Sequence, residues 1–228
     1  MDRYADGRTI SARRRDKALV IEEALRTLLP EMRDGLIVDF GSADGAIPVL
    51  LLKSPVGERI RGVIGVTLLD YNDLAEKPAH VHPRYTRLVG DLSGPLDGLD
   101  LPWERCDAVT ATGFFHYLTE PQVAFAHAFR LLKPGGYLLA GMPARWVLAL
   151  RRRGCGPWLP PNNYIRTIIS IEDWARLAVS CGFTEVSRRA VQWFGQSWSV
   201  PLECRLRCVP ILHRWGGHYL LIFRKPVG

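Results

Sequence analysis

The chain has 228 residues, of which 47% are hydrophobic, and it contains seven Trp. This length and composition suit one α/β domain with an added segment and can fill a sizeable core. No uncharged apolar run reaches the ~18 residues of a membrane span, and the N-terminus lacks an apolar secretory core, so we expect no transmembrane segment and no signal peptide. Five Cys, an odd number without framework spacing, favour reduced thiols, and we expect a cytoplasmic protein.

The formal net charge is +7, and basic side chains cluster in two Arg triplets at 13–15 and 151–153. Such clusters can form a solvated surface, or they can bind an anionic small molecule or the phosphates of a nucleic acid. Proteins that read bases usually add an aromatic platform among the basic residues, and neither triplet has one nearby. The sequence leaves both the solvated surface and the anion-binding interpretation open.

The first part of the chain predicts a helix followed by a strand, a turn and a second helix. Apolar residues from Ala18 to Leu29 follow an amphipathic pattern, which predicts a helix packed on a sheet. An apolar run at 36–40 carries the carboxylate of Asp39 and predicts the first strand. The small-residue turn 41–45 leads directly into an apolar segment that starts a second helix.

A strand, a tight turn and a helix start form the place where open α/β sheets bind cofactors. Small residues let the backbone approach a ligand closely, and the helix N-terminus presents unpaired N–H groups. A dinucleotide turn would read G-x-G-x-x-G, and here Ala43 and Ala46 replace two of its three glycines. The spacing acid-x-G-x-G-x-G is matched by Asp39, Gly41 and Gly45, with Ala43 at its middle glycine.

Strands and helices continue along the chain. The further predicted strands are 61–67, 88–92, 106–112, 137–141, one from residue 183 and 218–223. A helix is predicted at 121–132, and Lys133-Pro134-Gly135-Gly136 should stop it because Pro and Gly break helices. Ser170 is a cap-like residue at the start of another helix, which should end at Cys181.

The first turn, Gly90-Asp91-Leu92 and the junction 131–139 resemble, in order, the motifs of class I S-adenosylmethionine-dependent methyltransferases. The resemblance covers residues 34–141. It implies an α/β fold with a Rossmann-like, seven-stranded, mostly parallel sheet, helices on both faces and an antiparallel last strand at the sheet edge. The expected single domain, 1–228, consists of an N-terminal helical segment (1–33), a cofactor-binding core (34–141), an acceptor-side insertion (142–170) and the C-terminal part of the sheet (171–228).

The resemblance also implies S-adenosylmethionine as the cofactor. Asp39 and the first turn would face its methionine part, Asp91 its adenine amino group and Leu92 the adenine ring. The expected cofactor-binding residues are Asp39, Gly41, Ser42, Ala43, Asp44, Gly45, Thr67, Leu68, Asp91, Leu92, Thr112 and Gly113. Asp39 and Asp91 can instead be ordinary turn or cap carboxylates.

One departure from the family concerns the second strand. In the family this strand usually ends in Asp or Glu, which holds both ribose hydroxyls, but here it ends in Thr67. A Thr hydroxyl can make one such hydrogen bond and lacks the charge of a carboxylate. Either Thr67 substitutes weakly, Asp70 reaches back, or the cofactor site is degraded. Ala43 is a smaller departure, because Ala costs little there if its φ is negative.

The acceptor side is less specific in sequence. His116 is the only side chain at the exit of the fourth strand that titrates near neutral pH, so it is the candidate catalytic residue, although it can instead be a packing or capping His. The insertion 142–170 is too long for a simple connection. The candidate substrate-binding residues are Phe115, His116, Trp146 and Tyr164. His80-x-His82 and Cys204-x-x-x-Cys208 lack further ligands, so we expect no metal site.

The sulfonium of the cofactor carries an activated methyl group, so the enzyme need only align the acceptor and manage its proton. We expect methyl transfer to a small organic acceptor on O or N, and the net positive charge of the chain favours an anionic acceptor. One alternative is an RNA methyltransferase whose Arg clusters contact phosphates. A second alternative is a non-catalytic methyltransferase-like partner protein, which the departure at Thr67 motivates.

Overall fold

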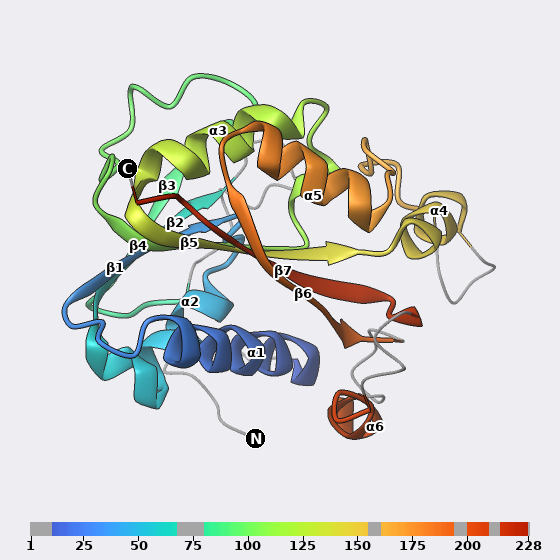
Figure 1. Ribbon diagram of the computed structural model, residues 1–228, viewed down its shortest axis with the longest axis horizontal. Coiled ribbons are helices and arrows are strands. Elements are labelled where there is room, and N and C mark those ends of the chain that lie inside the picture. Colours follow the sequence, from blue (N-terminus) through green and yellow to red (C-terminus); the bar gives the residue numbers. More distant parts are fainter. Residues whose placement is uncertain (1–10, 68–79, 155–160, 194–199, 210–214, 228) are drawn as a thin grey trace.

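The apolar runs predicted as strands pair into one seven-stranded sheet in the computed structural model, which describes residues 11–67, 80–154, 161–193, 200–209 and 215–227 (Figure 1). The strands are β1 (Gly35–Phe40), β2 (Ile60–Thr67), β3 (Tyr85–Val89), β4 (Cys106–Thr112), β5 (Leu132–Pro143), β6 (Thr184–Gln192) and β7 (His218–Arg224). Their order in the sheet is β3-β2-β1-β4-β5-β7-β6. Strands β1 to β5 pair in parallel, as expected for a Rossmann-like sheet.

The last strand is antiparallel, as predicted, but its expected position at the sheet edge is wrong. β7 lies between β5 and β6 and is antiparallel to both. The burial of the two strands explains this order: β7 is apolar and buried along most of its length, whereas β6 has mostly exposed or half-exposed residues. An interior strand is covered by helices on both faces, while an edge strand tolerates polar residues such as Arg188 and Arg189.

Helices cover both faces of the sheet, which confirms the predicted architecture (Figure 1). α1 (Ala12–Leu28) and α2 (Ala46–Lys53) pack on one face, and α3 (Pro121–Leu131) and α5 (Ile171–Ser180) pack on the other. The remaining helices are α4 (Arg145–Arg153), α6 (Val200–Leu206) and the 3-10 turns η1 (Pro55–Arg59) and η2 (Phe115–Tyr117). None of the helices in the described part of the chain has the length and apolar character that crossing a membrane requires.

Three boundaries differ from the sequence expectation. α1 begins at Ala12 with Ser11 as its cap, so the first Arg triplet lies inside the helix and not before it. β3 ends at Val89, because the Asp91 side chain accepts a hydrogen bond from the Ser93 backbone N–H (2.8 Å) and turns the chain. The helix α3 ends at Leu131, one residue before the predicted end, and β5 begins at Leu132 and not at residue 137, with residues 133–136 bulged out opposite β4.

The strand directions gather several chain ends at one edge of the sheet. The carboxyl ends of the parallel strands β1, β4 and β5 lie together, and the antiparallel β7 begins at the same edge, where His218 pairs with Pro143. Open α/β sheets bind ligands at the carboxyl ends of their strands. The N-terminal turns of α1 lie at this edge as well, so a site here is built from segments far apart in the sequence.

Candidate active site

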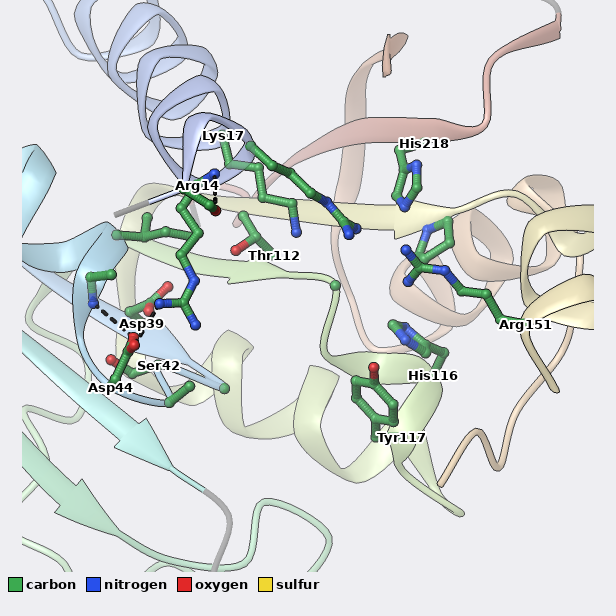
Figure 2. A pocket seen from close by; sticks show the side chains of 18 residues that line it. Arg14, Lys17, Asp39, Ser42, Asp44, Thr112, His116, Tyr117, Arg151 and His218 are labelled. Carbon is green, nitrogen blue, oxygen red and sulfur yellow. Dashed lines mark hydrogen bonds and ion pairs between the residues drawn. The ribbon is translucent and has the colours of Figure 1, made fainter. Parts of the chain in front are cut away.

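A cavity of about 310 Å³ opens at this edge of the sheet (Figure 2). α1 contributes Arg13, Arg14 and Lys17, and the end of β1 with its turn contributes Asp39 and residues 41–44. The lining from the other elements is Ala46 and Ile47 on α2, Thr112 at the end of β4, Gly113, His116 and Tyr117 after β4, Pro143 at the end of β5, Arg151 on α4 and His218 on β7. The size falls at the lower end of the range that small-molecule sites occupy.

The turn after β1 adopts a backbone conformation that favours glycine. Gly41, Ala43 and Gly45 all have positive φ, of 71°, 52° and 77°. An added Cβ at Gly41 would lie 2.5 Å from the Phe114 ring, so the turn is closely packed as well as left-handed. Ala43 was expected to cost little if its φ were negative, but its φ is positive. An alanine in the left-handed conformation destabilises the fold by about 1 kcal/mol.

Asp39 is the buried carboxylate of the cavity. It is the second-last residue of β1, has 3% of its surface exposed and accepts a hydrogen bond from Thr110 Oγ1 at 2.5 Å. Burial raises its pKa to about 7, and hydrogen bonds from Thr110 and Ser42 and the nearby Lys17 charge oppose this shift. A carboxylate held in this way is stabilised by a cationic ligand, because the opposite charge offsets the hydration lost on burial.

Asp44 ties the turn to the N-terminal helix. Its Oδ2 lies 2.5 Å from Nη1 of Arg14, so α1 is anchored across one side of the cavity. Asp44 Oδ1 also accepts from the backbone N–H of Ala46 at the start of α2. The two acids that line the cavity, Asp39 and Asp44, therefore both lie at the end formed by the first turn.

Thr67 faces the turn and not the cavity. Its side chain is 1% exposed, and its Oγ1 donates to the carbonyl of Ala43 at 3.3 Å. Leu68 and Asp70, the other residues considered for the cofactor at this strand end, lie outside the described residues.

This geometry gives a prediction for Thr67→Val, which keeps the shape and removes the hydroxyl. We expect the free energy of unfolding to fall by about 1 kcal/mol, because the Ala43 carbonyl loses its donor. We expect the Kd for S-adenosylhomocysteine to change by less than about threefold, since the hydroxyl is committed to the turn. Urea unfolding and calorimetry measure the two quantities, and a tenfold loss of affinity would instead assign Thr67 to the ligand.

Other predicted site residues lie apart from the cavity. Leu92 is fully buried in the core, and Asp91 is exposed on the turn after β3. Phe115 is also fully buried and stacks on Phe125 with ring centroids 4.2 Å apart. Trp146 on α4 and Tyr164 are exposed, by 55% and 45%, and neither lines the cavity.

Two buried imidazoles face the cavity on the side away from the first turn (Figure 2). His116 is 1% and His218 is 6% exposed, and neither ring nitrogen of either residue has a hydrogen-bond partner among the described residues. Burial, together with the Arg151, Lys17 and Arg13 charges, lowers the pKa of His116 to about 3. The same causes hold the pKa of His218 well below its usual value, so both rings are neutral at neutral pH.

Lys17 lies between the two ends of the cavity (Figure 2). Burial lowers its pKa to about 7, and the neighbouring Arg13, Arg151 and Arg14 charges act in the same direction. Its ammonium is close to the chain after β4, since Nζ lies 3.3 Å from where a Cβ on Gly113 would be. Lys17 is therefore a group that can gain or lose a proton near neutral pH.

The cavity contains residues that the sequence analysis did not assign to it. Arg13, Arg14 and Lys17 recur at helical spacing of three and four residues, and this pattern could have placed them on one helix face. Arg151 and His218 carry no such local signal. They reach the cavity only because α4 follows β5 and β7 pairs with it.

Comparisons with known proteins agree with this fold. A family described as "Methyltransferase domain" matches residues 12–188, and no curated protein sequence matches the chain. An S-adenosylmethionine-dependent methyltransferase from Mesorhizobium loti is 19% identical with a TM-score of 0.61 over 89% of this chain and 96% of that chain. A second such enzyme, from Thermotoga maritima, is 20% identical with a TM-score of 0.58 over 93% and 91%. The [4+2]-cyclase SpnF is 18% identical with a TM-score of 0.63 over 93% and 81%, and at these identities the structures show the shared fold alone.

Proposed function

Because the chain belongs to the class I S-adenosylmethionine-dependent methyltransferases, we propose that it transfers the cofactor's methyl group to a small organic acceptor, on oxygen or nitrogen. The observation that carries this proposal is the cavity itself, which joins the turn after β1 to the exit of β4. A cofactor held at the turn and an acceptor held beside His116 would share one cavity, and methyl transfer requires such alignment at near contact distance.

The residues at the turn fit the cofactor. S-adenosylmethionine supplies a sulfonium-activated methyl group, and its methionine part carries an ammonium and a carboxylate. In this proposal the buried carboxylate of Asp39 faces the cationic groups, while Gly41 lets the backbone approach closely. Thr112 and Gly113 line the cavity where the two ends meet. Asp91, exposed on the turn after β3, stays the proposed contact of the adenine amino group.

An acceptor hydroxyl or amine must lose a proton during methyl transfer. An effective general base has a pKa near the working pH. His116, the candidate catalytic residue, is neutral at pH 7, but a pKa of about 3 makes it a weak proton acceptor. Lys17 has a pKa of about 7 and lies between the two ends of the cavity. We therefore assign to Lys17 the role of taking up the proton that the methyl acceptor loses, and we assign His116 to the cavity wall.

The inward position of the arginines favours a small acceptor over RNA. Arg13, Arg14 and Arg151 line the cavity, whereas phosphate contacts along a nucleic acid require an outward-facing basic surface. Arg152 and Arg153 are exposed, but they form a short patch at the end of one helix.

The test is a calorimetric titration of the full chain with S-adenosylmethionine and S-adenosylhomocysteine, with NADPH as the control. We expect Kd values of about 1–100 μM for the first two ligands and no binding of NADPH. A protein that is folded by circular dichroism and binds neither adenosyl ligand would overturn the proposed function.

A further inference from the structure

The cavity has two ends of opposite chemical character. The end at the first turn holds both of its lining acids, Asp39 and Asp44, and Asp44 is already paired with Arg14. The opposite end is formed by His116, His218 and Arg151, which come from three different elements and face one another (Figure 2). No acid among the described lining residues lies at that end.

The basic end holds donors that the protein leaves unsatisfied. Each neutral imidazole has one N–H donor, and no ring nitrogen of His116 or His218 meets a partner in the described parts of the chain. Buried polar groups are nearly always hydrogen-bonded, so two unpartnered rings on one cavity wall are unusual. Arg151, half-buried beside them, adds a guanidinium whose fork matches a carboxylate or a phosphate.

Positive charges surround the two imidazole rings. Arg13, Lys17 and Arg151 act on both rings in the same direction, disfavouring a positive charge on either imidazole. A cluster of cations around buried donors is stabilised by an anion, because the anion relieves the repulsion and satisfies the N–H groups together. A packing role alone would not require three cationic side chains to point into a cavity.

We propose that His116, His218 and Arg151 form a subsite for an anionic group, a carboxylate or a phosphate, carried by the methyl acceptor. This assignment rests on the proposed methyl transfer, and it narrows the acceptor to an acidic small molecule. The cationic sulfonium would lie at the acidic end and the anionic acceptor at the basic end, so the cavity separates the two reactants by charge.

The experiment is an NMR titration of the full chain saturated with S-adenosylhomocysteine, following the ring nitrogens of His116 and His218. The probes are benzoate, phenyl phosphate and the uncharged benzamide, which share one ring. We expect one of the anions to bind at least about tenfold more tightly than benzamide and to shift both imidazole signals. Whether benzoate or phenyl phosphate binds more tightly identifies the anionic group as a carboxylate or a phosphate.

Arg151→Gln and Arg152→Gln form a matched pair, because both remove one charge from α4 but only Arg151 lines the cavity. We expect Arg151→Gln to weaken binding of the anion about tenfold and Arg152→Gln to change its affinity by less than about twofold.

Three outcomes bear on the proposals. Anions that bind no better than benzamide, or equal losses of affinity in the two variants, would overturn the subsite. If Arg151→Gln weakens only S-adenosylhomocysteine, the arginine serves the cofactor and the subsite is also overturned. Failure of the adenosyl ligand to bind wild-type protein contradicts the proposed function instead, and the same anion titration without it still tests the subsite.

Discussion

Replacing Asp39 with Asn should weaken S-adenosylmethionine binding by about tenfold to a hundredfold, since a hydrogen bond to a charged group contributes ~1.5–3 kcal/mol. Asn keeps the size of the side chain and can still accept the hydrogen bond from Thr110 Oγ1. What it removes is the negative charge that faces the cavity at the end of β1. Calorimetry on the folded variant measures the affinity, and an unchanged Kd would show that Asp39 does not contribute to cofactor binding.

The same substitution should stabilise the ligand-free protein, and the sign follows from the pKa of Asp39. Burial raises that pKa to about 7, so the folded state holds the proton more tightly than the unfolded state between about pH 4 and pH 7. Ionisation therefore lowers the free energy of unfolding as the pH rises through this window. We expect Asp39→Asn to gain roughly 1–3 kcal/mol at about pH 8 and much less at about pH 5.

A matched control is available in Asp107→Asn. Asp107 is also a buried carboxylate of the sheet, but it accepts from the Leu36 backbone N–H, pairs with Lys133 and does not line the cavity. Its replacement should lower stability and change the affinity for S-adenosylmethionine by less than about twofold. Of the two substitutions, only Asp39→Asn is thus expected to raise the free energy of unfolding while it weakens cofactor binding. This combination is expected of a residue that serves binding at a cost in stability. If both variants are destabilised equally at each pH, Asp39 is a structural carboxylate.

Gly41→Ala should destabilise the protein by about 3 kcal/mol, through a left-handed alanine and a steric clash. Gly41 has a φ of 71°, and its added Cβ would lie 2.5 Å from Cδ2 and 2.8 Å from Cβ of Phe114. Phe114 is 3% exposed and packs edge-on against Phe40, so it has little room to move. We also expect the displaced turn to lose most of its affinity for the cofactor.

Gly98→Ala provides the comparison for this prediction. Gly98 is exposed, and a Cβ there would meet nothing within 4 Å. Urea unfolding should therefore give a change within about 0.5 kcal/mol for Gly98→Ala. Equal effects of the two substitutions would show that the turn after β1 accommodates a side chain, and the close-approach argument for cofactor binding would fail.

The sequence by itself determined the features that depend on neighbouring residues. The strand β1, its small-residue turn and the start of α2 follow from an apolar run, Gly41 and Gly45, and these residues also carried the resemblance to the family, which the family match confirms. The N-cap at Ser170 could likewise be predicted from the sequence, because a capping box is made within four residues. Local backbone and hydrogen-bond preferences suffice for such features, so they can be recognised without knowing the fold.

Only the tertiary structure decided how the cavity is completed. The Thr67 hydroxyl donates to the carbonyl of Ala43, and Phe115 is buried in the core, although both residues lie at or near strand ends where ligands bind. Arg14, Arg151 and His218 reached one cavity from a helix, a second helix and a strand that lie far apart in the sequence. Their meeting depends on β7 inserting beside β5 and on α1 crossing the sheet edge. Those placements are set by burial of apolar surface across the whole domain, which no short stretch of sequence encodes.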